Sequence, residues 1–407
     1  SLIVLFALSF IAYMFIYKFK SALNLSWLIA IAILFRSLFL FSMPALSDDF
    51  YRFLWDGQLV VNGINPYSFL PAEVQLSFPN KDLLLSRMNS PNYYSVYPPA
   101  NQLFFAIAAL LSPYSIFGAI IVLRLLILLA EIGTLLILPK FLRELNIPNK
   151  NSLLYALNPL VIVELSGNLH FEAVWIFTFL IAIRWVYHKK YTLSSIFWSI
   201  AASVKLIPLL FLPVLCRKLS LKKLLPYYLI AFLVFALSFA PFFERSVFDK
   251  FFSSIKLYSS TFEFNASFYS LFKTIIYQFL GYNPIKILGP IMSFIGLAGL
   301  LFFLLRKKMK SPQVLFSALL FGLSWYYFFG MVVHPWYVVS LVFFSVFTQL
   351  RFALLWSFLI TLSYYAYSQA GFSESNWLLL VEYGLVIGVL VFELFGNKSS
   401  RCLPRQS

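Results

Sequence analysis

Residues 47–67, SDDFYRFLWDGQLVVNGINPY, form an unusually polar segment in a very apolar chain. The segment contains three aspartates, an arginine and two asparagines, whereas only 11% of the 407 residues are charged and 61% are hydrophobic. Apolar runs recur from one end of the chain to the other, and the mean hydropathy is +0.85. Soluble globular proteins are only about half apolar. The sequence therefore predicts a polytopic membrane protein in which this segment is a loop.

The positive charge of the chain lies in short clusters between the apolar runs. Twenty of the 31 Lys and Arg residues fall in seven places: 17–20, 139–150, 184–190, 216–223, 305–310, Arg351, and a tail with Lys398, Arg401 and Arg405. Positively charged loops of membrane proteins lie on the cytoplasmic side. The net charge of +16 therefore indicates membrane topology, and we expect no nucleic-acid partner.

The alternate connections then lie outside, and they hold most of the polar motifs. These outer segments are 44–97, 166–170, the turn near Lys205, 242–284, 330–336 and 370–376. The alternation fails once, because two apolar stretches, 98–111 and 115–138, lie where one net crossing is needed. We expect the first stretch to lie in the membrane interface or to re-enter.

Several apolar stretches are too short to cross a membrane. Residues 152–165, 192–204 and 206–215 would form helices of roughly 15–20 Å, against about 30 Å of hydrocarbon. They stop at polar residues, among them His170 and Lys205. Polar groups at that depth need shielding by protein or by a water-filled cavity. The pattern favours a cavity in the outer half of the membrane, and loose packing or local bilayer thinning is the alternative.

The long outer loop, residues 44–97, has a helical pattern of its own. Apolar residues recur at helical spacing directly after Asp48 and Asp49, and a second short stretch at 80–88 is also expected to be helical. We expect amphipathic helices that lie on the outer surface. A helix needs only one of the two acids as its cap. The other is free to act as a general base at the membrane surface.

The outer loop resembles the first outer loop of the GT-C superfamily of glycosyltransferases. The matching motifs are DDFYRFLWDG (48–57), GINPY (63–67) and YPP (97–99), followed in order by NPLVIVELSGNLHFEAV (158–174), ASVKLIPLLFLP (202–213), EFNASFY (263–269) and HPWY (334–337). The nearest resemblance is to glycosyltransferase family 87 and to the mannosyltransferases that depend on polyprenol-phosphate-mannose. The mannosyltransferases of GPI-anchor synthesis resemble the chain more distantly.

This resemblance implies an all-α GT-C helical bundle of about 10–13 membrane helices, some of them short, in a single domain over residues 1–407. It implies inverting transfer of a hexose, expected to be mannose, from a polyprenyl-phosphate-linked donor to an acceptor glycan or glycolipid. The partners are therefore membrane lipid, donor and acceptor, and no metal or other cofactor is expected. The expected location is a bacterial plasma (inner) membrane, with the reaction at its extracytoplasmic face as part of cell-envelope synthesis.

The resemblance also implies an Asp general base in the outer loop, and two alignments select different residues. Spacing back from Arg52 selects Asp49, as in the lipid A aminoarabinose transferase. Spacing back from Tyr51 and Asp56 selects Asp48, as in the GPI-anchor enzymes. Asp49 is slightly favoured, and both remain candidates.

The leaving phosphate needs groups that stabilise its charge. The candidates are Lys205, at a helix break, then His334 and Arg52. A lysine that snorkels to the interface for stability is the alternative for Lys205.

Candidates for the sugar and the acceptor lie in the outer motifs: Asp56, Asn65, Tyr97, Asn168, His170, Glu172, Trp336 and Tyr337. Helix capping, interhelical hydrogen bonds and the aromatic belt of membrane proteins are the alternatives for these residues. Glu164 would brace the loop at 166–170. Arg124 and Glu131 share a helix face, and we expect a buried structural pair with other partners there.

A transporter or flippase of a lipid-linked sugar is the alternative function, since it would also need intramembrane charges and a cavity. Transporters often contain internal repeats. No such repeat is visible in this sequence, and the outer loop is long and asymmetric. The sequence therefore favours a transferase.

Overall fold

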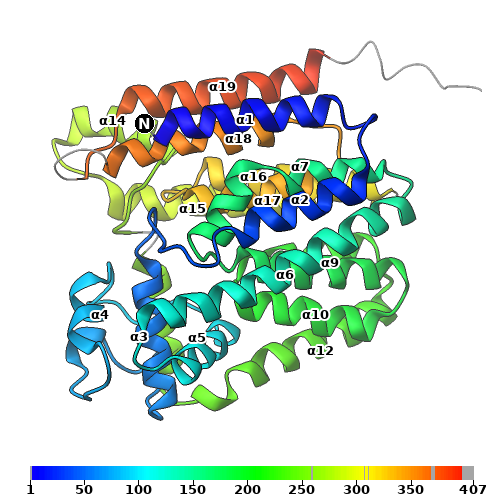
Figure 1. The fold of residues 1–407 in the computed structure, drawn as a ribbon. Helices are drawn as coiled ribbons and strands as arrows, with labels where there is room; N and C mark the ends of the chain where they lie inside the picture. Colours follow the sequence, from blue (N-terminus) through cyan, green and yellow to red (C-terminus); the bar gives the residue numbers. More distant parts are fainter. Residues whose placement is uncertain (1, 258–259, 307, 310, 368–371, 397–407) are drawn as a thin grey trace, which may run out of the picture.

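The computed structural model describes residues 2–257, 260–306, 308–309, 311–367 and 372–396. Most of these residues are helical, and the one β-type contact among them is an isolated bridge between Phe264 and Val332. The long helices run alongside one another as a bundle, and shorter ones lie at one end of it (Figure 1). The predicted all-α polytopic architecture is confirmed for this part of the chain.

The α-helices follow one another along the chain, with the longest connection at residues 62–80. They are α1 (Leu2–Lys18), α2 (Leu25–Ser37), α3 (Asp49–Val61), α4 (Lys81–Arg87), α5 (Pro99–Leu111), α6 (Ile116–Glu144), α7 (Leu153–Ala156), α8 (Pro159–Ile162), α9 (Glu172–Tyr187), α10 (Tyr191–Val204), α11 (Ile207–Phe211), α12 (Leu221–Ser238), α13 (Val247–Leu257), α14 (Phe268–Leu280), α15 (Ile285–Leu305), α16 (Pro312–Phe328), α17 (Pro335–Ser345), α18 (Phe352–Leu359) and α19 (Asn376–Phe395). Short 3₁₀ or π turns complete the set: η1 (Pro71–Glu73), η2 (Asn149–Ser152), η3 (Val163–Gly167), η4 (Leu212–Arg217), η5 (Ala240–Phe242) and η6 (Ile360–Tyr367).

Many helices begin where the sequence provides a cap or a proline. The side chains of Asn24, Ser115, Ser311 and Ser375 accept hydrogen bonds from backbone N–H groups in the first turns of α2, α6, α16 and α19. Pro335 starts α17, where its missing N–H and fixed φ suit the first helical position. His334 is thereby held at the start of that helix.

Four described helices, α6, α12, α15 and α19, are long and apolar enough to cross a membrane. The number of spans is five if the bent pair of helices on either side of residues 168–171 counts as one span. Seven shorter apolar helices of 10–17 residues accompany them. The chain is thus an integral membrane protein, while the expected total of 10–13 membrane helices stays a prediction.

The three stretches predicted to be short are short. Residues 152–165 divide into α7, α8 and the π-turn η3, and the chain bends by 112° between 159–167 and α9. Helix α10 ends at Val204, and α11 has only five residues. Lys205 therefore lies in a break between helices, as predicted.

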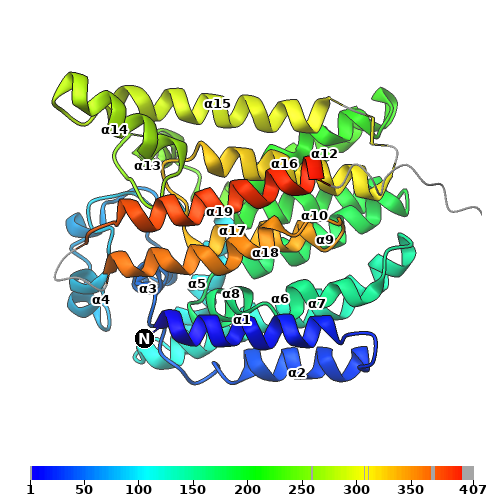
Figure 2. The ribbon, with the colours of Figure 1, turned by 90° about the horizontal axis from the view of Figure 1, so that it is seen from above.

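The outer loop forms the two predicted helices, α3 and α4. Figures 1 and 2 show α3 running across the end of the bundle, nearly perpendicular to the long helices. It crosses α5 very closely, because a Cβ added at Gly57 would lie 2.2 Å from the carbonyl oxygen of Phe105. Helix α6, with 29 residues, can make the crossing between 97 and 139 alone. The interfacial or re-entrant path of 98–111 stays a prediction.

The basic clusters gather at the end of the bundle away from α3 (Figure 1). Lys150 donates hydrogen bonds to the carbonyls of Lys20 and Leu23, at 2.5 and 3.0 Å. Glu144 binds Arg184 at 2.6 Å, which joins the cluster at 139–150 to the one at 184–190. The basic tail, with Lys398, Arg401 and Arg405, lies outside the described residues, as do Lys307 and Lys310.

Candidate active site

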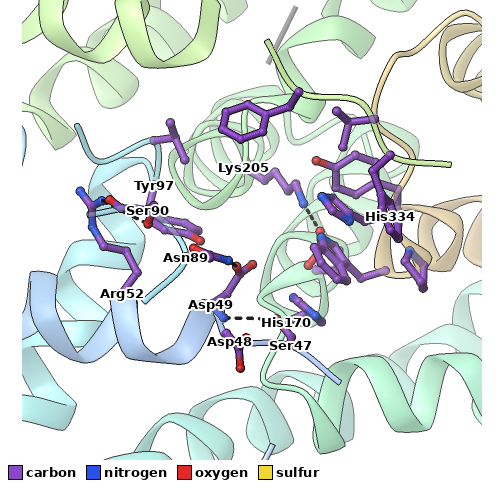
Figure 3. A pocket seen from close by; sticks show the side chains of 18 of the residues that line it. Ser47, Asp48, Asp49, Arg52, Asn89, Ser90, Tyr97, His170, Lys205 and His334 are labelled. Atoms are coloured by element: carbon purple, nitrogen blue, oxygen red, sulfur yellow. Dashed lines mark hydrogen bonds and ion pairs between the residues drawn. The ribbon is translucent and has the colours of Figure 1, made fainter. Parts of the chain in front are cut away.

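A cavity of about 1520 Å³ opens at the end of the bundle where α3 lies. It is lined by the outer loop, the starts of α9 and α17, the α10–α11 break and the C-terminal half of α13. Ten of the thirteen predicted site residues line it: Asp48, Asp49, Arg52, Tyr97, His170, Glu172, Lys205, His334, Trp336 and Tyr337. Figure 3 shows several of these side chains turned toward one space. Motifs that are far apart in sequence therefore meet in one cavity.

The two adjacent aspartates at the start of α3 have different surroundings. Asp48 occupies the N-cap position, but its side chain makes no capping hydrogen bond within the described chain, and it is exposed. Asp49 is half-buried, and its carboxylate accepts a hydrogen bond of 2.9 Å from the side-chain amide of Asn89 (Figure 3). Burial raises the pKa of Asp49, while the hydrogen bond from Asn89 and the charge of Lys205 oppose that rise. A raised pKa makes the ionised carboxylate a stronger base.

Lys205 forms an ion pair with Glu172 inside the cavity. The Lys205 side chain is 27% exposed and that of Glu172 only 4%. The ammonium group also lies 4.6 Å from the centre of the Tyr337 ring, over its face. An ammonium group has three donors, and the pair with Glu172 uses one of them, so Lys205 has donors left for a ligand. The sequence shows no acid near Lys205, and only the fold brings Glu172 to it.

An aromatic stack forms the far wall of the cavity. The Trp336 ring packs against His170 with ring centres 3.8 Å apart and against His334 at 4.2 Å, nearly parallel to both. Phe264 extends the stack beyond His334 at 4.8 Å. Burial, and then the nearby charge of Lys205, lowers the pKa of His334 to about 3. His334 is therefore neutral at physiological pH, and can assist a phosphate only as an N–H donor.

Arg52 lines the cavity, and two of its three guanidinium nitrogens are bound within the protein, while Nη2 has no hydrogen-bond partner among the described residues. Its Nε donates to Asp56 at 2.7 Å, and Nη1 donates to the carbonyls of Ser90 and Tyr93 at 3.0 and 2.9 Å. In Figure 3 its guanidinium is turned toward Ser90. These bonds hold the segment that also contains Asn89, the partner of Asp49. The geometry thus supports Arg52 as an organiser of the loop, and its role as a phosphate ligand stays a prediction.

Three predicted residues, Asp56, Asn65 and Asn168, are not among the described residues that line the cavity. Asp56 is fully buried and accepts hydrogen bonds from Arg52, Ser95 and Gln102. A buried acid with these partners holds the outer loop to α5, so the structure gives no support to a sugar contact at Asp56.

The two asparagines are also bound within the protein. Asn65 donates to the carbonyl of Phe242 at 2.8 Å and to Glu244 at 3.0 Å. Asn168 accepts from the backbone N–H of Leu46 at 3.3 Å. Each amide therefore joins two segments of chain. This is the structural role that stood as the alternative to sugar or acceptor binding for these residues.

The predicted structural roles of the helix charges are confirmed. Arg124 donates to four backbone carbonyls, including that of Ser166 at 2.6 Å. Glu131 instead binds Arg36 at 2.6 Å and the hydroxyl of Tyr155 at 2.5 Å. Both residues are completely buried.

Two further residues of the outer motifs are hydrogen-bonded within the protein. Glu164 accepts hydrogen bonds from Asn168 and Tyr364, so it braces the loop as expected. Asn265 is 2% exposed and donates to Glu382, which leaves its side chain inaccessible to glycosylation.

Sequence reasoning missed Asn89 and Glu263, which both line the cavity. Asn89 lies between two short helices, in a polar stretch that resembles any surface loop. Glu263 is bound by Lys273, by Tyr269 at 2.8 Å and by Asn283 at 2.7 Å. It belongs to the EFNASFY motif, which could have identified it. Among the described residues, no group of three or more His, Cys, Asp and Glu side chains is arranged for a metal ion.

Comparison with known proteins gave one family match. The MptA_B family model, described as Alpha-(1->6)-mannopyranosyltransferase, N-terminal domain, matches residues 2–219, which is more than half of the 407 residues. The matched range contains both aspartates, His170, Glu172 and Lys205, and it ends before His334. No curated protein matches the chain.

Proposed function

The chain belongs to this family of alpha-(1->6)-mannopyranosyltransferases, and we propose that it transfers mannose from a polyprenyl-phosphate-linked donor to an acceptor glycan or glycolipid. The observation that carries this proposal is the single cavity in which a half-buried acid, Asp49, and a cation, Lys205, line the same space. A glycosyl transfer needs both groups, one for the attacking hydroxyl and one for the leaving phosphate.

Asp49 is the proposed general base. The acceptor hydroxyl attacks the anomeric carbon of the donor while its proton passes to the Asp49 carboxylate. The bond between that carbon and the phosphate oxygen breaks, and its electron pair leaves with the phosphate. A single inverting displacement that yields an alpha linkage requires a beta-linked donor. The half-buried position of Asp49 and its bond to Asn89 favour it over Asp48, which is exposed.

Lys205 is the proposed ligand of the departing phosphate. The phosphate gains negative charge as the bond breaks, so a fixed cation stabilises the transition state more than the ground state. His334, which is neutral, would donate a hydrogen bond to the same phosphate. Glu172 pairs with the lysine while the cavity is empty and competes with the donor phosphate for it when the donor binds.

The cavity is proposed to open on the extracytoplasmic side of the membrane. The basic clusters lie at the other end of the bundle, which supports this orientation through the positive-inside rule. Single cysteines at Gln75 and Ser220, both exposed, can be introduced into a cysteine-free background. An impermeant maleimide should label position 75, and not 220, in intact cells. The reverse pattern would refute the orientation.

A defined transfer assay tests the function. Purified protein receives isotope-labelled polyprenyl-phosphate mannose and a panel of mannose-containing acceptors, and the products are read by mass spectrometry. NMR of the product then gives the configuration and position of the new bond. We expect an alpha-(1→6)-linked mannose, formed by the wild type and not by Asp49→Asn. Transfer from a nucleotide sugar in the absence of lipid donor would refute the proposed donor class.

A further inference from the structure

A cluster of three aromatic rings borders the cavity at the end of the bundle where α3 lies. Tyr367 is the last residue of η6, and Phe372 lies shortly before α19, whose start is at that end (Figures 1 and 2). Their ring centres are 5.4 Å apart, and both contact Phe264, at 5.8 and 6.1 Å. All three residues line the cavity. Tyr367 is 60% exposed and Phe372 is 54% exposed, and contiguous exposed apolar surface commonly marks a binding site.

The buried member of the cluster, Phe264, is fixed by its backbone. Its N–H donates to the carbonyl of Met331 at 3.0 Å, and its carbonyl accepts from the N–H of Val333 at 2.9 Å. The next residue, Asn265, has a left-handed backbone with φ of +48°, and its N–H donates to Glu374. The two exposed rings therefore rest on a rigid support. A preorganised surface of this kind binds a ligand with little loss of conformational entropy.

A row of ring contacts leads from this cluster to the proposed phosphate ligand. Phe264 packs against His334 with ring centres 4.8 Å apart, and His334 contacts Tyr337 at 5.4 Å. The ammonium group of Lys205 then lies 4.6 Å from the centre of the Tyr337 ring. The cation therefore lies at one end of the row, and the exposed rings form the other end.

Acidic side chains act on the exposed end of the row. Burial raises the pKa of the Tyr367 phenol to about 12, and the charges of Asp49, Glu374 and Asp48 contribute to that rise. Tyr367 is thus an uncharged phenol beside three carboxyl groups. Carboxylates repel a phosphate, and they accept hydrogen bonds from hydroxyl groups. This end of the cavity is therefore suited to an uncharged, hydroxyl-rich ligand.

We propose that Tyr367 and Phe372 form a platform for an uncharged acceptor glycan, whose terminal sugar lies at Asp49 while the preceding sugar stacks on the two rings. This inference rests on the proposed function and deepens it, because it assigns one end of the cavity to the acceptor and the other to the donor. A pyranose presents C–H groups on its face, which pack on aromatic rings, and hydroxyls at its edge, which bind carboxylates. The family match ends at residue 219 and does not include this platform.

Acceptors of different length test the platform. A methyl mannoside can occupy only the position at Asp49, whereas an α-(1→6)-linked mannotriose also reaches the rings. We expect Tyr367→Ala and Phe372→Ala to raise the KM of mannotriose by about three- to tenfold, because each removes one stacking contact. The KM values of methyl mannoside and of the lipid donor should stay unchanged.

Two further variants serve as controls. Tyr367→Phe keeps the ring and removes only the hydroxyl, so it should retain most of the affinity for mannotriose. Tyr114→Ala removes an exposed ring that is not among the described residues lining the cavity, and it should have no effect. If the KM rises equally for both acceptors in Tyr367→Ala, as the melting temperature falls, the rings only support the fold and the proposal is wrong.

Binding without turnover separates this inference from the proposed function. Purified protein without donor is titrated with mannotriose, followed by saturation-transfer NMR, and separately with polyprenyl phosphate. We expect the two alanine variants to bind mannotriose more weakly and polyprenyl phosphate normally. The opposite pattern would assign the rings to the prenyl chain and overturn the proposal, as would a wild type that does not bind mannotriose. If mannosyl transfer fails in every assay while the rings still govern mannotriose binding, the proposed function is refuted and the platform stands.

Discussion

Two buried ion pairs in this protein use the same chemistry in different surroundings. Arg36 and Glu131, from α2 and α6, are both fully enclosed, and the second carboxylate oxygen of Glu131 is bound by Tyr155. Lys205 and Glu172, from the α10–α11 break and the start of α9, face the cavity, and the Lys205 side chain is 27% exposed. The first pair is enclosed by protein, and its one unpartnered side-chain nitrogen among the described residues, Arg36 Nη2, is buried as well. The second pair has an ammonium group with donors left for a ligand.

The difference separates a charge that holds helices together from a charge that is kept for a ligand. Enclosed pairs are costly to break, because the remaining partner is left charged and buried. A pair that borders a water-filled cavity can be opened or shared at lower cost. If this distinction is correct, changes at the first pair affect stability, and changes around the second affect the reaction.

The largest effect is expected from Asp49→Asn at the cavity end. Loss of a positioned general base should reduce turnover by roughly 10²–10⁴-fold while the protein stays folded. Asp82→Asn, an exposed acid in the same outer loop, is the control and should be silent. Turnover is compared at equal expression and equal melting temperature. Near-normal turnover in Asp49→Asn, with a large loss in Asp48→Asn, would transfer the role to the other acid.

Glu131→Gln addresses the enclosed pair. Removal of the charge leaves the Arg36 guanidinium buried without its counterion, which should cost about 3–5 kcal/mol of stability. The measurement is thermal unfolding of the purified protein in one detergent, together with donor binding per folded molecule. A normal melting temperature with impaired donor binding would contradict the comparison.

Sequence reasoning could predict the fold because its signals are local. Apolar runs, charge clusters and the helix breaks at Lys205 and His170 each depend on a short stretch of chain. The distribution of positive charge alone separated the end of the bundle that carries the cavity from the end that carries the basic loops. The helical outer loop was predicted in the same way, from spacing after Asp48 and Asp49.

The pairing of charges could not be predicted, because it depends on contacts between distant segments. Lys205 and Glu172 are 33 residues apart, and their ion pair exists only because the bent segment around 168–171 returns the start of α9 to the α10–α11 break. For Asp56, a contact with the ligand was predicted that the structure does not support. It stands in a motif that resembles a site, but its position on the buried face of α3 gives it only protein partners.

Lys205→Met should distinguish the second ion pair from the first, because it should affect donor binding and turnover more than stability. A charge-assisted hydrogen bond to phosphate contributes roughly 1.5–3 kcal/mol, so we expect weaker donor binding and lower turnover, with little change in apparent acceptor affinity. Lys286→Met, an exposed lysine, is the control. If Lys205→Met binds donor as the wild type does and melts at a lower temperature, this lysine is structural, like Arg36.

Glu172→Gln tests the comparison directly. It should improve donor binding, whereas the same substitution at Glu131 should reduce stability. It removes a negative charge beside the phosphate and releases Lys205, so donor binding should tighten by roughly two- to fivefold. The cost in stability should be smaller than in Glu131→Gln, since the lysine is solvated by the cavity. Weaker donor binding would show that Glu172 is needed to position Lys205.

The smallest effect, a shift in pH dependence, concerns Asn89. Asp49 must be ionised to accept a proton, so activity is lost as the pH falls through its pKa. Burial raises that pKa above the ordinary value, and the hydrogen bond from Asn89 lowers it again by stabilising the ionised form. Asn89→Ala removes only the lowering contribution. The acid limb of kcat/KM should therefore move to higher pH, while the rate at high pH stays close to that of the wild type. Asn92→Ala, an exposed asparagine three residues along, should leave the profile unchanged. An acid limb that stays in place in Asn89→Ala, or that moves to lower pH, would mean that the group titrating in kcat/KM is not the Asp49 carboxylate. The base would then have to be sought at Asp48, which is exposed and has no such partner in the described chain.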